Sequence, residues 1–163
     1  STHQARLAGA LAPEPGLRYD LPLTRAVLAR VQLFMNVRHA IVAATPVVVV
    51  EDDNDTLELY SMSLRAAGYD VRPARTGAEA LDLVRRVHPR VVVTDLTLPD
   101  LGGVELCKAV SDAGLPGLEA LIVVSGSGDQ DLLSKVRAAG ARDVLVKPCL
   151  PTDLEAAIRR ALS

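Results

Sequence analysis

Aromatic residues are scarce in this sequence, which holds one Phe, three Tyr and no Trp among 163 residues. Surfaces that bind single-stranded nucleic acid stack bases on aromatic side chains, so this class of binding is not expected. The sequence has no cluster of Lys and Arg that would indicate a groove for a phosphate backbone, and its net charge is −2. We therefore predict no direct contact with nucleic acid.

Cysteine and long apolar runs are scarce as well. The two cysteines form no CxxC pair, which excludes a disulfide-rich scaffold and favours a cytoplasmic location with reduced thiols. No uncharged apolar stretch approaches the roughly 18 residues that span a bilayer, and no secretory signal is visible. With 49% hydrophobic residues the chain is nonetheless globular, and its core must be built from Val, Leu, Ile and Ala.

Charge divides the sequence near Thr45 and Pro46. Residues 1–45 carry five arginines against two acids, whereas residues 46–163 carry an excess of acids over bases. We therefore expect an N-terminal extension or linker at 1–45, helical in part, and a single domain at 46–163.

Strand and helix patterns alternate through residues 46–163. Runs of valine such as Val47–Val50 and Val91–Val93 are too uniformly apolar to be half exposed and indicate strands buried on both faces. Each run precedes a stretch with helical spacing, and for the last helix Thr152 is the expected cap. Strands are expected near residues 47–50, 69–72, 91–93, 121–124 and 144–146. Five such units predict an α/β fold with a doubly wound parallel sheet.

Polar side chains follow four of these strands. Because the carboxyl ends of parallel strands share one edge of the sheet, these side chains should meet in one crevice. Carboxylates that lie so near one another repel unless a cation binds between them. A set of hard oxygen ligands without His or Cys selects Mg²⁺. The side chains concerned are Glu51, Asp52, Asp95, Ser125 and Lys147.

Residues 46–163 resemble the receiver domain of response regulators in bacterial two-component signalling. The motifs that carry the resemblance are VVVVEDD (47–53), VVVTDLTLPDLGG (91–103), LIVVSGSGD (121–129) and DVLVKP (143–148). The resemblance implies a flavodoxin-like fold whose sheet has the strand order 2-1-3-4-5, a case that general fold rules already describe.

The resemblance also implies roles for single residues. Asp95 matches the phosphoacceptor, and Lys147 matches the lysine that contacts the phosphoryl group. Asp52 and Glu51 match the acids that bind Mg²⁺ directly and through water, and Thr97 stands where a backbone carbonyl completes the metal shell. The phosphodonor would be a phosphohistidine on a histidine kinase or a phosphotransfer protein.

Switching is expected to depart from the common pattern of the family. Ser125 matches the hydroxyl that responds to phosphorylation. The position that often holds a responding Tyr or Phe is Val144. We therefore expect the loop at 125–129 to move and the rearrangement to be carried by backbone and packing shifts near the fourth and fifth strands.

Two alternatives stand beside a phosphorylated receiver. One is a receiver fold that works as an unphosphorylated interaction module. The other is a haloacid-dehalogenase-type phosphatase, but that class has a second aspartate where Thr97 stands. We expect an acceptor that phosphorylates itself and can dephosphorylate itself, not a turnover enzyme.

Residues 23–44 contain neither Gly nor Pro and predict a helix. One apolar stripe recurs with a mean step of about 3.6 and consists of Leu23, Val27, Val31, Phe34, Val37 and Ile41. Further apolar residues widen this stripe. An apolar arc this wide is unusual for a helix that lies on one surface, and it favours a homodimer through residues 23–44. The alternatives are a helix that docks on its own receiver and the remnant of an upstream domain.

Overall fold

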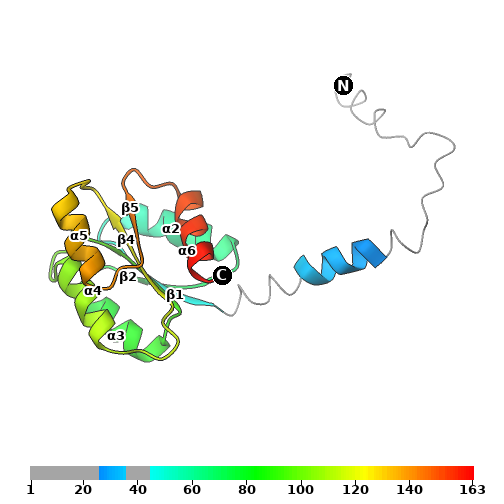
Figure 1. Cartoon of the computed structure of the whole chain (residues 1–163), viewed down its shortest axis with the longest axis horizontal. Coiled ribbons are helices and arrows are strands. Elements are labelled where there is room, and N and C mark those ends of the chain that lie inside the picture. Colours follow the sequence, from blue (N-terminus) through cyan, green and yellow to red (C-terminus); the bar gives the residue numbers. More distant parts are fainter. Residues whose placement is uncertain (1–25, 36–44) are drawn as a thin grey trace, which may run out of the picture. The chain divides into compact units, whose positions relative to one another are not determined.

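The computed structural model describes residues 26–35 and 45–163 (Figure 1). The chain divides into two units, Ser1–Arg38 and His39–Ser163. In the second unit five parallel strands form one sheet in the order β2-β1-β3-β4-β5, as predicted. The strands are β1 (Pro46–Val50), β2 (Asp70–Ala74), β3 (Val91–Asp95), β4 (Ala120–Ser125) and β5 (Asp143–Val146).

Helices cover both faces of the sheet (Figure 1). The helices are α2 (Asn54–Ala66), α3 (Gly77–Val87), α4 (Gly103–Asp112), α5 (Gln130–Ala138) and α6 (Pro151–Ala161). One aliphatic cluster joins the sheet to α2 and α6, and a second joins the other face to α3, α4 and α5. Every residue of Val47–Val50 is at most 1% exposed, because alternate valines enter opposite clusters. The parallel register therefore brings the carboxyl ends of the strands to one edge.

Helix boundaries differ from the prediction mainly at α6. Pro151 occupies the first turn and Leu150 is the N-cap residue, with no side-chain cap. The prediction that Thr152 caps this helix is wrong, because the fixed φ of proline favours the first helical position and places Thr152 inside the helix. Thr76 is the N-cap residue of α3, and its side chain accepts a hydrogen bond from the Glu79 amide.

The first unit contributes a helix at residues 26–35. All of its residues are exposed within the described structure, including six large apolar side chains that are 53–66% exposed. The remaining parts of the helix predicted at 23–44 lie outside the described residues. No helix of the described ranges has both the length and the apolar character needed to cross a membrane.

Candidate functional site

Three acids converge where β1 and β3 end. Glu51 and Asp52 follow the last residue of β1, and Asp95 is the last residue of β3. One carboxylate oxygen from each lies within 4.8 Å of the other two. Glu51 and Asp95 are buried and Asp52 is exposed, so the cluster opens to solvent on the side of Asp52.

Lys147 follows β5 and reaches across the sheet edge to two of these acids. Its Nζ lies 2.7 Å from Oδ2 of Asp95 and 2.8 Å from Oε2 of Glu51. The carboxylates are 7% and 3% exposed, so the ammonium compensates two charges that water scarcely reaches. Removal of one partner from such a contact leaves a buried charge unpaired.

Burial and charge act in opposite directions on these groups. Burial raises the pKa of Glu51, although its hydrogen bond from Lys147 lowers it. Burial would lower the pKa of Lys147, but hydrogen bonds to Asp95 and Glu51 outweigh it and raise that pKa above its ordinary value. Lys147 therefore stays charged at neutral pH.

The donor set fits a hard divalent cation. All three ligand candidates are carboxylates, which suit Mg²⁺ and not zinc or copper. Lys147 contacts Glu51 and Asp95, and the described residues include no ion pair to Asp52. One Lys therefore faces three acids, which leaves the cluster with an excess of negative charge that a cation would balance.

Of the remaining predicted residues, Thr97 and Ser125 lie at this edge, and Val144 lies within β5. The Thr97 amide donates to Oδ1 of Asp95 at 3.1 Å, which places Thr97 directly beside that carboxylate. Ser125 ends β4 and is 1% exposed, and its carbonyl accepts a hydrogen bond from the Lys147 amide at 2.7 Å. Val144 is partly buried and packs with the cluster under α3, α4 and α5.

Two polar contacts near the site escaped the sequence prediction. Arg75 donates from Nη2 to the carbonyl of Asp52 at 3.1 Å and so ties the end of β2 to the acid loop. Asp100, in the loop after β3, accepts from the amides of Gly77 and Ala78 at 2.8 and 2.9 Å. A carboxylate in a Pro-Asp turn is a recognisable signal, but only the fold shows which helix it caps.

A further contact joins α2 to the loop after β5. Tyr60 on α2 donates its hydroxyl proton to the carbonyl of Cys149 at 3.1 Å, two residues beyond Lys147. Burial raises the pKa of Tyr60 to about 12, so the phenol stays protonated and keeps this bond. The loop that carries Lys147 is thereby fixed to α2.

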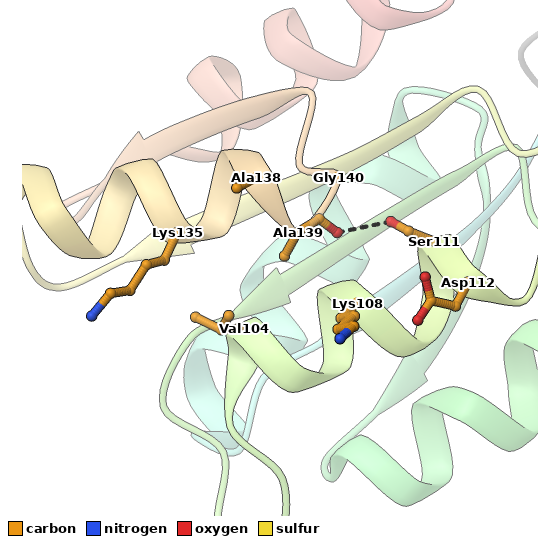
Figure 2. A pocket seen from close by; sticks show the side chains of 8 residues that line it. All are labelled: Val104, Lys108, Ser111, Asp112, Lys135, Ala138, Ala139 and Gly140. Carbon is orange, nitrogen blue, oxygen red and sulfur yellow. Dashed lines mark hydrogen bonds between the residues drawn. The ribbon is translucent and has the colours of Figure 1, made fainter.

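A shallow groove of about 450 Å³ lies between α4 and α5, and none of the acid-cluster residues lines it (Figure 2). The hydroxyl of Ser111 donates to the carbonyl of Ala139 at 2.9 Å and joins the two walls. Lys108 stands on one wall and Lys135 on the other. The groove marks where the two helices that follow β3 and β4 approach each other.

Comparisons of sequence and of structure both find that this chain is similar to receiver domains of response regulators. The family model "Response regulator receiver domain" matches residues 47–159. The DNA-binding response regulator MtrA of Mycobacterium tuberculosis is 31% identical over 117 residues, covering 71% of this chain and 50% of that protein. A probable transcriptional regulator of Porphyridium aerugineum is 37% identical, with coverages of 71% and 47%.

Solved structures agree with the fold. The chemotaxis response regulator CheY4 of Vibrio cholerae superposes with a TM-score of 0.68 and 27% identity, covering 72% of this chain and 98% of that one. A CheY-like receiver domain protein from Methanospirillum hungatei superposes with a TM-score of 0.67 and 28% identity, covering 72% of this chain and 93% of that one. The chain thus spans about half the length of these curated relatives but nearly all of these structural ones.

Proposed function

This chain belongs to the response regulator receiver domain family, and from that membership we propose that Asp95 accepts a phosphoryl group from a phosphohistidine. The donor would be a histidine kinase or a phosphotransfer protein, and the reaction would take place in the cytoplasm. The observation that carries the proposal is the contact of Lys147 with the buried carboxylate of Asp95, beside a solvent-facing acid cluster.

Each group has a definite task in the proposed transfer. A carboxylate oxygen of Asp95 forms the new O–P bond while the P–N bond breaks, and its electron pair returns to the imidazole nitrogen. Lys147 compensates negative charge on Asp95 and on the incoming phosphoryl oxygens. Glu51, Asp52 and Asp95, with the carbonyl of Thr97, would hold Mg²⁺, which supplies further charge neutralisation at those oxygens.

We propose one transfer per molecule and not continuous turnover. A haloacid-dehalogenase-type phosphatase needs a second acid where Thr97 stands, and here the other two acids of the cluster come from the end of β1. The phosphorylated chain then signals by a change of conformation that starts at Ser125. The absence of direct nucleic-acid contact stays a prediction, because two relatives named above are DNA-binding or transcriptional regulators.

The test is the intact mass of the protein after incubation with acetyl phosphate and Mg²⁺. The wild-type chain should gain one phosphoryl group, and Asp95→Asn should gain none, because an amide is not a competent nucleophile. Wild-type protein that stays unmodified favours the interaction module, and steady release of phosphate favours the phosphatase. A phosphorylated Asp95→Asn variant would overturn the site assignment.

We also propose that residues 23–44 join two copies of the chain. The observation is the helix at 26–35, where Arg30 and Gln32 are the polar residues and six large apolar side chains are more than half exposed. A helix that lies on a single surface would carry a broader polar face. A second copy offers the same apolar surface, so both helices lose their exposure together.

A further inference from the structure

The switch hydroxyl of Ser125 is held inside its own loop. Oγ accepts a hydrogen bond from the Ser127 amide at 3.0 Å and donates its proton to the Ser127 carbonyl, also at 3.0 Å. The side chain is buried, so these bonds replace those that water would make. Ser125 is therefore fully engaged before any phosphoryl group arrives.

The same pattern repeats toward α5. Oγ of Ser127 accepts from the amide of Asp129 at 3.1 Å. Oδ1 of Asp129, the N-cap of α5, accepts from the amides of Asp131 and Leu132 at 2.8 and 3.2 Å. Side chains at 125, 127 and 129 thus each hold an amide two residues further on, from the strand end into the first turn of α5.

The first link must break when Ser125 turns toward Asp95. Val124 pairs with Asp95 in the sheet, so Ser125 lies on the neighbouring strand, one residue beyond the position that is paired with Asp95. A serine hydroxyl has one proton, and a proton given to a phosphoryl oxygen is lost to the Ser127 carbonyl. The Ser127 amide then also loses its acceptor, because Oγ has moved.

The position that carries an aromatic side chain in many receivers cannot transmit this movement here. Val144 is partly buried within the aliphatic cluster and has no polar group to exchange partners. A route through hydrogen bonds is present instead, and Ser127 is its middle member.

We propose that Ser127 is a positioning residue that couples the Ser125 hydroxyl to the N-cap of α5. The inference rests on the proposed phosphorylation of Asp95. Recruitment of Ser125 releases the Ser127 amide, shifts the Ser127 hydroxyl away from Asp129, and loosens the first turn of α5. The groove in Figure 2 is lined by Lys135 and Ala138 from the C-terminal part of α5. This wall then responds to a change that begins in the first turn of the same helix.

The experiment measures amide hydrogen exchange in the full chain, with and without Mg²⁺ and beryllofluoride, a mimic of the phosphoryl group. In the wild type beryllofluoride should speed exchange of the Asp129 amide about fivefold, as expected for the loss of one hydrogen bond. Ser127→Ala should show fast exchange in both states and no response. Ser127→Thr keeps the hydroxyl and should restore both the protection and the response.

Ser111→Ala is the matched control. It removes a serine hydroxyl that contacts the other end of α5 through Ala139, so the Asp129 response should stay as in the wild type. A Ser127→Ala variant that responds like the wild type, or a Ser127→Thr variant that fails to restore the response, overturns the coupling.

Intact mass after acetyl phosphate treatment separates the two levels of the proposal. If the wild type gains a phosphoryl group but exchange at Asp129 does not change with beryllofluoride, the coupling through Ser127 is wrong and the proposed function stands. If the wild type gains none, the proposed function fails and the coupling fails with it.

Discussion

At the scale of single residues, the site depends on how one ammonium is shared between two buried carboxylates. Lys147 keeps its charge because its pKa is raised, so its contribution to stability is complete below its ordinary value of 10.5. That contribution is lost only as pH rises through the raised pKa. Burial keeps the pKa of Glu51 above its ordinary value of 4.5 even though the hydrogen bond from Lys147 lowers it, so stability is lost as pH rises through the raised pKa and this acid ionises. In the proposed transfer Asp95 becomes an acyl phosphate, and Lys147 then loses one of its two carboxylate contacts.

Asp52 and Asp53 are adjacent acids with different expected effects on Mg²⁺. Asp52→Ala should weaken Mg²⁺ binding by about tenfold or more, since even the outer partners of metal ligands cost that much when removed. Asp53→Ala is the control, because this carboxylate is the cap of α2 and accepts from the Thr56 amide at 2.9 Å. Calorimetric titration of both variants measures the difference. Equal affinities would remove Asp52 from the metal site.

Asp100 makes a second residue-scale prediction, on pH. Its hydrogen bonds from the Ala78 and Gly77 amides hold its pKa below the ordinary value of 3.8. The ionised form of Asp100 therefore stabilises the fold above pH 3.8, and this contribution is lost as pH falls through the lowered pKa.

Asp100→Asn should therefore be less stable than wild type at pH 7, with a difference that shrinks at acid pH. Urea unfolding at several pH values measures it. Asp112→Asn serves as control, since no hydrogen bond to this carboxylate occurs among the described residues. A difference for Asp100→Asn that does not depend on pH would refute the role of its charge.

At the scale of elements, α4 and the turn before β5 meet with almost no space between them. Gly140 has φ +105°, and a Cβ there would lie 2.0 Å from Oγ of Ser111. The same hydroxyl donates to the carbonyl of Ala139, so it cannot move aside without losing that bond.

Gly140→Ala should destabilise the fold by at least about 1–2 kcal/mol from the left-handed backbone alone. Gly126→Ala is the matched control, because a Cβ added there would have no other atom within 4 Å and its φ is not left-handed. Urea unfolding compares the two, and Ser111→Ala combined with Gly140→Ala should recover the part due to the contact. Equal stabilities of Gly140→Ala and Gly126→Ala would contradict this account.

The strands were predictable because their signal is local. Runs such as Val47–Val50 indicate strands that are buried on both faces, and the structure confirms this burial. The strand order was implied by the resemblance to receiver domains, and the structure confirms it as well. Strand ends then placed the site residues, and the structure brings Glu51, Asp95 and Lys147 into direct contact.

Contacts between distant segments were not predictable in the same way. Lys147 bonds Glu51 as well as Asp95, although Lys147 and Glu51 are 96 positions apart in the sequence. Only the packing of the folded chain brings these two side chains together. The contact of Asp100 with the first amides of α3 is of the same kind. Two local signals also compete at the start of α6. Thr152 predicted a capped start there, but Pro151 occupies the first turn and determines where the helix begins.

At the scale of the whole molecule, the helix at residues 26–35 predicts the oligomeric state. Light scattering after size exclusion, at tens of micromolar, should give a dimer for residues 1–163. Val31→Glu with Phe34→Glu places charges on the apolar stripe and should give monomers, whereas Gln32→Glu changes a polar position and should not. A monomeric wild type would refute the dimer, and a dimer of residues 46–163 would place the interface on the receiver.

The position of the lysines makes the molecule convenient to observe. The sequence has three, and the other fifteen basic side chains counted with them are arginines. Lys147 contacts Asp95, while Lys108 and Lys135 stand on opposite walls of the α4–α5 groove. Reductive methylation with ¹³C-formaldehyde labels amines and keeps their charge. One spectrum of three lysine methyl signals would therefore follow the chemistry at Asp95 and the separation of two helices in the same sample.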